Sequence, residues 1–270
     1  MDLSRDTELR ALAARLDDLA LRAAKGDVGI TPFLSPRELH MAREYLSRNG
    51  AAFASFGGYA DAERQRVYLL PEYMEEISSD EARDDFENKM SEYGYSLNIS
   101  LLKISGSGYR QLTHRDFLGS VLGLGIERSV VGDIVVLDGG REAAVFCDGA
   151  ISDFIAGELL FVANDKVKVT RVALGSLLLP EKRTLPIHDT VAAPRLDAVV
   201  AAICSLSRER ARETVVSGLV ELDFEAEERP DRAVNAPAVI SVRGFGRYRV
   251  LSLCDKTRKG RYRLEAEKYI

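Results

Sequence analysis

The order of secondary structure predicted between residues 97 and 172 is the feature that most constrains the fold of this chain. Residues 97–104 predict a strand, 113–123 a helix, 133–137 and 143–147 two strands joined by a turn at 138–140, 151–162 an amphipathic helix and 166–171 a last strand. A β-α-β-β-α-β order folds into an antiparallel sheet with both helices on one face. We therefore expect an α+β fold class, with this domain in the middle of the chain.

RNA-recognition (RRM) domains share this topology, so the middle domain is predicted to be RRM-like, or ferredoxin-like. RRM domains carry their RNP1 motif on the third strand, where two aromatic side chains stack on RNA bases. The third predicted strand, residues 141–146, has one aromatic residue, Phe146. The tetrapeptide Arg243-Gly244-Phe245-Gly246 matches the start of RNP1 but comes about a hundred residues later. We expect the RRM fold without its base-stacking residues.

The region before this domain, residues 1–75, is expected to be mainly helical. A helix over 7–25 should end at Gly26, and a second should begin at Ser35-Pro36 and end near Asn49-Gly50. Two short strands are expected at 52–56 and 66–70. The RRM-like domain is assigned to 76–174, and the proline-containing segment 175–193 to an interdomain linker.

The C-terminal region, residues 194–270, predicts two short helices that are separated near 205–207. The second helix has an apolar stripe of Ala211, Val215 and Val216, and it should end at Ser217-Gly218. Strands are expected at 219–222, 238–243 and 247–253. Together these elements predict a small α+β domain at the end of the chain.

Charge is distributed unevenly. The net charge of −5 divides into −8 over residues 1–190 and +3 over 191–270, and residues 243–268 contain nine basic and three acidic side chains. A basic end on an acidic body indicates one polyanion-binding face. Three widely spaced cysteines, the lack of an apolar signal-peptide core and a longest apolar run of only 198–204 predict a cytoplasmic protein with no membrane partner.

The C-terminal region resembles the S4-type RNA-binding domain in the order of four short motifs. They are Arg195-Leu196-Asp197, then Ser207-Arg208 with Ala211, then Gly218 with Val220, then Val242-Arg243-Gly244 with Gly246-Arg247. Two departures are the segment Leu222-Asp223-Phe224 and the dipeptide Pro237-Ala238. The resemblance implies a C-terminal S4-type (αL) domain whose arginines contact RNA phosphates. The expected RNA-binding residues are Arg195, Ser207, Arg208, Arg212, Gly218, Arg243, Arg247 and Arg249.

Most of the remaining chain resembles the YlmH family of bacterial S4-domain proteins. The matching segments are 56–59, 62–64, 114–120, 122–126 and 132–134. The resemblance implies binding to rRNA and tRNA on the large ribosomal subunit, a role in quality control or rescue of stalled translation, and a link to division proteins. Further expected RNA contacts are His114, Arg115, Lys256, Arg258, Lys259 and Arg261.

Motifs of catalysis are incomplete. His114-Arg115-Asp116-Phe117 starts like a kinase catalytic loop, but the asparagine that this loop requires is absent, and a D-F-G motif is missing from the sequence. The glycine pairs at 106–108 and 123–125 are better explained as turns than as nucleotide-binding loops. The three histidines are too scattered for a metal site. We therefore expect a non-enzymatic protein with no cofactor; the alternatives are an RNA-modifying enzyme with an appended S4-type domain and an interaction factor in cell division.

Overall fold

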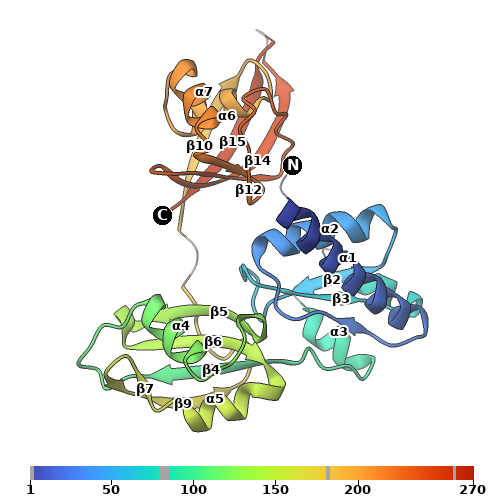
Figure 1. Ribbon diagram of the computed structural model, residues 1–270, viewed down its shortest axis with the longest axis vertical. Coiled ribbons are helices and arrows are strands. Elements are labelled where there is room, and N and C mark those ends of the chain that lie inside the picture. The colour runs from blue at the N-terminus through green and yellow to red at the C-terminus, as the bar shows by residue number, and fades with distance from the viewer. Residues whose placement is uncertain (1–2, 79–84, 181–182, 258–259) are drawn as a thin grey trace. The chain divides into compact units, whose positions relative to one another are not determined.

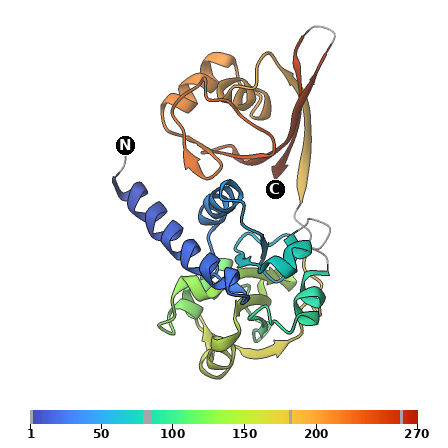
Figure 2. The same ribbon diagram turned by 90° about the vertical axis from the view of Figure 1, so that its right-hand side faces the viewer.

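The computed structural model describes residues 3–78, 85–180, 183–257 and 260–270. The chain forms two compact units, of which the first spans Met1–Pro180 and the second Glu181–Ile270 (Figures 1 and 2). Each unit has its own hydrophobic core. The two are therefore described separately.

The N-terminal half of the first unit packs two helices on a small antiparallel sheet of order β1-β3-β2. Ser35 begins α2 as predicted: its hydroxyl accepts from the Glu38 amide, and the Glu38 carboxylate accepts from the Ser35 amide. The elements are α1 (Leu3–Ala24), β1 (Gly29–Ile30), α2 (Pro36–Arg48), β2 (Phe53–Phe56), β3 (Arg66–Leu69), η1 (Glu72–Ser78) and α3 (Phe86–Glu92).

The second half of this unit is the predicted RRM-like domain. Its four-stranded antiparallel sheet has the order β5-β6-β4-β9, so the first and third strands of the β-α-β-β-α-β series lie in the centre. This confirms the predicted topology, although α5 is shorter than residues 151–162. The elements are β4 (Ile99–Ser105), α4 (His114–Leu122), η3 (Arg128–Val130), β5 (Val131–Leu137), η4 (Asp138–Gly140), β6 (Glu142–Asp148), η5 (Gly149–Ile151), α5 (Ser152–Glu158), β7 (Phe161–Val162), β8 (Asp165–Lys166) and β9 (Lys168–Val172).

Both faces of this sheet are covered. Leu102 and Val145 face α4 and α5, and they pack with Phe117 and Ile155 of those helices. The alternate residues of the same strands face the other way and form a second core with the N-terminal half. The sheet is thus the shared middle layer of the first unit.

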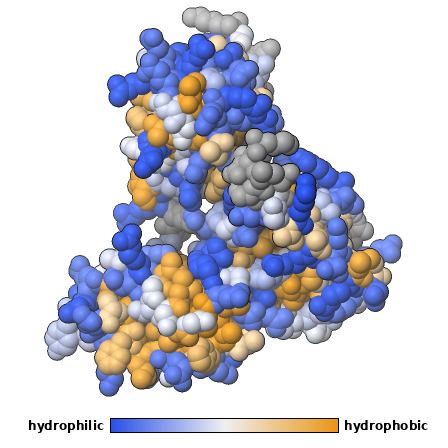
Figure 3. Space-filling model, in the orientation of Figure 1, coloured by the Kyte–Doolittle hydropathy of each residue, from blue (hydrophilic) through white to orange (hydrophobic). Residues whose placement is uncertain are grey.

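The visible surface over the helices of this domain is largely apolar. Figure 3 shows apolar side chains gathered where α4 and α5 lie in Figure 1. Among the large apolar side chains, Phe154, Leu160 and Phe161 of α5 and the segment after it are about half exposed. Polyanions bind to charged surfaces, so this apolar area is not suited to contact nucleic acid.

The second unit packs α6 and α7 on one face of a six-stranded antiparallel sheet of order β10-β15-β14-β13-β11-β12. Ser207 caps α7 by accepting from the Arg210 amide, and Gly218 follows the helix with a φ of +66°. The elements are β10 (Thr184–Val191), α6 (Leu196–Ile203), α7 (Arg208–Val216), β11 (Val220–Leu222), β12 (Glu225–Ala226), β13 (Ala238–Val242), β14 (Gly246–Lys256) and β15 (Tyr262–Tyr269).

Two predictions for this region were wrong. The segment 175–193, predicted to be a linker, contains β10, which pairs with β15 along its whole length. Pro186 breaks the apolar alternation, but β10 is an edge strand, where the missing amide donor of proline is tolerated. Val216 was expected in the core and is 55% exposed, because Ala211 and Val215 alone turn toward α6 and the sheet.

Candidate nucleic-acid interfaces

The sheet face that RRM domains use to stack RNA bases is closed in this protein. Phe146, on the third strand, is 1% exposed, and its ring stacks on Tyr59 with the centroids 5.0 Å apart. Around it, residues of the N-terminal half such as Phe33 and Met74 form the second core. Base stacking on this face would require the two halves of the first unit to separate.

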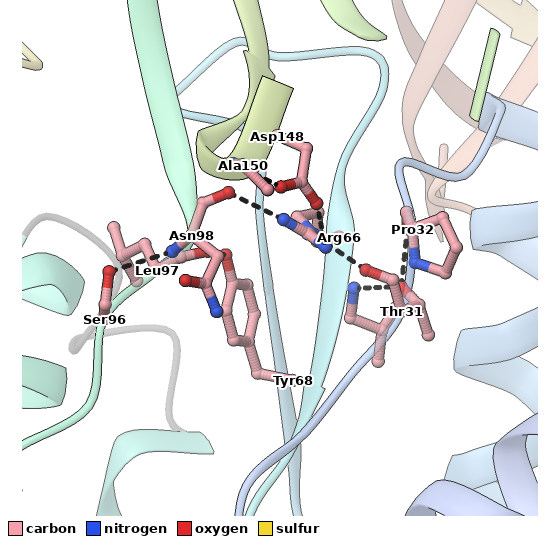
Figure 4. A network of polar contacts seen from close by, with 10 residues as sticks. Thr31, Pro32, Arg66, Tyr68, Ser96, Leu97, Asn98, Asp148 and Ala150 are labelled. Atoms are coloured by element: carbon pink, nitrogen blue, oxygen red, sulfur yellow. Dashed lines mark hydrogen bonds and ion pairs between the residues drawn. The ribbon is translucent and has the colours of Figure 1, made fainter. Parts of the chain in front are cut away.

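A buried arginine joins the two halves (Figure 4). Arg66 of β3 forms an ion pair with Asp148 at 3.0 Å between Nη2 and Oδ2. Its other nitrogens donate to the carbonyl oxygens of Thr31 and Asn98, each at 2.7 Å, and its guanidinium lies over the Phe33 ring. The Arg66 side chain is only 8% exposed. The two terminal nitrogens are thus paired across the boundary between the halves, and Nε is paired within the N-terminal half.

A second polar network repeats this connection at Asp133. Its carboxylate accepts from the Tyr59 hydroxyl at 2.8 Å and from the amides of Glu63 and Arg64 at 2.7 and 3.0 Å. Arg64 in turn donates to the carbonyl oxygens of Val131 and Phe33. Burial raises the pKa of the Tyr59 hydroxyl well above its usual value, and the Asp133 charge adds to this effect. Tyr59 therefore stays protonated and serves as a donor.

Two glycines of the same region are required by close packing. Gly58 has a φ of +102°, and a Cβ there would lie 2.3 Å from Cδ1 of Phe146. At Gly132, a Cβ would come within 2.7 Å of the Phe33 ring. Together with Asp133, these positions belong to the segments on which the family resemblance rests. Their role is structural: they hold the N-terminal half on the sheet.

His114 and Arg115 lie in the first turn of α4, where both are exposed. Thr113 caps this helix: its hydroxyl accepts from the Asp116 amide, and the Asp116 carboxylate accepts from the Thr113 amide at 2.8 Å. The hydrogen bonds from Thr113 lower the pKa of Asp116. Asp116 is therefore the second member of a helix capping box, and its role in this motif differs from that of a kinase catalytic base.

In the second unit, Asp197 brings two of the predicted RNA-binding arginines together. Its carboxylate accepts from Arg208 at 2.8 Å and from Arg195 at 3.2 Å, while the Asp197 residue is only 4% exposed. The side chains of Arg195 and Arg208 remain 46% and 49% exposed. The buried carboxylate thus holds two guanidinium groups side by side at the surface, where a phosphate could reach them.

Arg212 continues this surface one helical turn further along α7. It is exposed, and its side chain makes no hydrogen bond or ion pair with any residue that the structure describes. Beyond the end of α7, the amide of Arg243 donates to the Leu219 carbonyl at 2.9 Å, which places the turn before β14 next to the chain leaving the helix. Arg243 is also exposed.

Arg247 and Arg249 do not belong to the surface formed by the helix arginines. Their neighbour Tyr248 is buried against α6 and α7, so alternation along β14 turns these two arginines to the opposite face of the sheet. There the Arg247 guanidinium lies 5.8 Å from the centre of the Phe224 ring, and Arg249 stands opposite Glu267 of β15. The predicted set of contacts is therefore divided between two faces.

The remaining predicted contacts surround the turn between β14 and β15. Arg261 donates from Nε to the Thr190 hydroxyl at 2.9 Å and also bonds the Thr190 carbonyl. This pairing fixes the side chain along β10. Arg258 and Lys259 lie outside the described residues, as does the side chain of Lys256.

Among residues 3–78, 85–180, 183–257 and 260–270, no group of three or more histidine, cysteine, aspartate or glutamate side chains is arranged to hold a metal ion. Nor does any helix of these ranges have the length and apolar character needed to cross a membrane.

Asp197 was missed as a functional residue by reasoning from the sequence. The sequence did contain a signal: Asp197 is an acidic residue inside the otherwise apolar run 196–200, two residues after Arg195. The exposed loop 106–112 was also missed, because its glycines were assigned only to a turn.

The fold and these surfaces define a two-unit α+β protein with a closed RRM-like sheet and its exposed arginines on other surfaces. Residues 84–176 match the family model "Putative RNA-binding domain in YlmH", and residues 8–74 match "YlmH, N-terminal". The chain belongs to the YlmH family.

Similarity to known proteins extends over most of the chain. It is 31% identical over 239 residues to the "Ribosome-associated protein quality control protein P2" of Bacillus subtilis (strain 168), which covers 88% of this chain and 86% of that protein. The solved structure of the cell division protein ylmH from Streptococcus pneumoniae has a TM-score of 0.47 and 24% identity, over 64% of this chain and 93% of that one.

Proposed function

We propose that this protein binds structured rRNA or tRNA on the large ribosomal subunit and acts, without catalysis of its own, in cytoplasmic quality control of translation. Membership of the YlmH family, with its RNA-binding domain model, supports RNA as the ligand. The name of the Bacillus subtilis relative supports the ribosomal setting. The C-terminal unit, as an S4-type domain, supplies the main contact.

The observation that carries this proposal is the row of arginines on α6 and α7. Arg195 and Arg208 share the buried Asp197 carboxylate, and Arg212 lies one turn beyond Arg208. Three cations offset by one carboxylate leave a local excess of two positive charges. Because Asp197 fixes two of the guanidinium groups before RNA arrives, less side-chain entropy is lost on binding.

Recognition on this surface is electrostatic. Arginine guanidinium groups donate two parallel hydrogen bonds to phosphate oxygens, and each neutralised phosphate releases counterions. Binding should therefore weaken as the salt concentration rises. The acidic character of residues 1–190 opposes indiscriminate coating of RNA, which favours docking at one place on the ribosome.

Co-sedimentation with ribosomes tests the proposal. Arg212 and Arg243 are the informative positions, since both are exposed and replacing Arg208 would leave the buried Asp197 with one partner fewer. Arg212→Glu with Arg243→Glu should weaken the affinity for ribosomes by at least about tenfold, because two attractive charges become repulsive. The fraction of protein that co-sediments should fall accordingly.

A matched control is Arg22→Glu with Arg48→Glu, which makes the same change of charge at two exposed positions of α1 and α2. It should co-sediment like the unmodified protein. Equal co-sedimentation of the Arg212→Glu, Arg243→Glu variant and the unmodified protein would show that this surface does not hold the ribosome.

A further inference from the structure

The loop between β4 and α4 presents an aromatic side chain to solvent. Tyr109 is 94% exposed, and Arg110 beside it is also exposed. Between Tyr93 and Arg115 the chain contains no acidic residue, in a protein with 42 of them among 270. An exposed aromatic residue in a positively charged segment is the combination with which proteins bind unpaired nucleotides.

The base of this loop is firmly held, so its tip is presented in a defined place. Gly106 donates to the Arg141 carbonyl and Leu112 to the Gly140 carbonyl, each at 2.8 Å. The buried Asp165 carboxylate accepts from the amide of Ser107 at 3.0 Å and also from its hydroxyl. Since both ends of the loop are bonded to the domain, Tyr109 at the tip is a preorganised surface residue.

Basic side chains from separate segments surround the loop. Lys168 stands opposite Ser105, the last residue of β4, and Lys166 follows directly after the Asp165 that binds the loop. Arg115 lies in the first turn of α4, just after the loop. These three residues and Arg110 are exposed, and their side chains form no hydrogen bond or ion pair with a described residue. The Arg110 charge also helps to lower the pKa of the Asp165 carboxyl at the base of the loop. Their positive charge is available to a ligand.

We propose that this end of the RRM-like domain binds an unpaired stretch of RNA, with Tyr109 stacked on a base and Arg110, Arg115, Lys166 and Lys168 on phosphates. The inference rests on the proposed function for the choice of RNA. It adds a second contact, separate from the arginines of α6 and α7. It also explains how an RRM-like domain can bind RNA when its sheet face is covered by the N-terminal half.

The test is the binding of a fluorescein-labelled, unstructured ten-nucleotide RNA to the full chain at 50 mM salt, measured by fluorescence anisotropy. All proteins carry Arg212→Glu and Arg243→Glu, so that those two C-terminal arginines do not contribute. Tyr109→Ala should weaken binding by about 5- to 100-fold, the effect expected for one lost stacking contact. Tyr109→Phe should retain affinity within about twofold, because the ring is kept.

Two further measurements separate stacking from general attraction. Phe154→Ala removes another exposed aromatic residue of the same domain, on α5, and should leave affinity unchanged. Four phosphate contacts predict a slope of about −3 for log affinity against log salt, and Lys166→Gln with Lys168→Gln should reduce its size by about one.

The proposal is overturned if the RNA is not bound at 50 mM salt, if Tyr109→Ala and Phe154→Ala bind equally, or if a duplex of the same sequence binds as tightly as the single strand. Its failure is distinguishable from failure of the proposed function. Ribosome co-sedimentation of the Arg212→Glu, Arg243→Glu variant tests the C-terminal surface, whereas the difference in affinity between Tyr109→Ala and Phe154→Ala tests the loop.

Discussion

Replacing Arg66 by methionine should destabilise the first unit more than any exposed substitution of the same kind. Methionine keeps much of the side-chain volume but removes the charge and all donors. Asp148, 22% exposed, loses its partner, and the carbonyl of the fully buried Thr31 loses its donor. Removing one member of a buried ion pair costs about 3–5 kcal/mol, and an orphaned buried carbonyl accounts for about 1–3 kcal/mol of such a loss.

The expected decrease in the free energy of unfolding is therefore about 3–5 kcal/mol. For a unit of this size it corresponds to a fall in Tm of about 6–20 °C. Urea unfolding followed by peptide-resolved hydrogen exchange measures this decrease for each unit of the full chain. Peptides of the second unit, which has its own core, serve as an internal reference.

The loss of stability in Arg66→Met is compared with that of a control and of a double variant. Arg48→Met removes an exposed arginine of α2 that pairs with Glu44, and it should change the free energy by no more than about 0.5 kcal/mol. Adding Asp148→Asn to Arg66→Met should cost little, because the ion pair is already lost. A loss below about 1 kcal/mol for Arg66→Met, or additive losses in the double variant, would contradict the role assigned to this arginine.

Three other outcomes follow from the first unit. Gly58→Ala should destabilise it by at least about 2 kcal/mol in urea unfolding, because the backbone there has a φ of +102° and a Cβ would meet a buried ring. Gly157→Ala in α5, where a Cβ meets no atom within 4 Å, should instead stabilise it by about 0.5–1 kcal/mol. Burial raises the pKa of the Cys147 thiol to about 12. At pH 8 a thiol reagent should therefore label the exposed Cys254 and react with Cys147 only on unfolding, as detected by mass spectrometry. Equal labelling of the two cysteines in the folded protein would contradict the fold. Hydrogen bonds from Ser107 at the base of the loop lower the pKa of Asp165. The ionised carboxylate therefore stabilises the fold at pH values above the pKa that Asp165 has in the unfolded chain, and this effect is lost as the pH falls through its pKa in the folded protein. The free energy of unfolding, measured from pH 7 to pH 3, should depend less on pH in Asp165→Asn.

The arrangement of secondary structure could be predicted because its signals are local. Ser35 and Ser207 cap α2 and α7 as expected, and the strands of the RRM-like sheet lie within a few residues of their predicted positions. Edge strands carry weaker signals. β10 was missed because Pro186 disturbs the alternation, and only its pairing partner, far along the chain, makes it a strand.

The covering of the sheet could have been anticipated in part. Residues 143–147 are continuously apolar, which is typical of strands that are buried on both faces rather than of a strand with one face in water. Which segment provides the cover could not be read from that run, since the contacts of Arg66 and Tyr59 with the sheet join residues more than seventy positions apart.

The residue types of the candidate interface could be predicted, but their arrangement on the surface could not. The sequence motifs suggested one set of arginines, but strand alternation sends Arg247 and Arg249 to the face away from α7. Conversely, Asp197 joins Arg195 to Arg208, because a helix start and a capped second helix meet in space. Contacts of this kind depend on packing, and spacing along the sequence does not reveal them.

The shared middle layer of the first unit has a consequence for biosynthesis. The N-terminal half leaves the ribosome first, yet its apolar side needs β4 and β6, which are made later and extend to Asp148. Until then the nascent chain exposes Phe33, Tyr68 and Met74 to the surrounding solution. Completion of this unit must therefore wait for the last strand, β9, and a pause in synthesis before that point leaves an intermediate with uncovered apolar side chains.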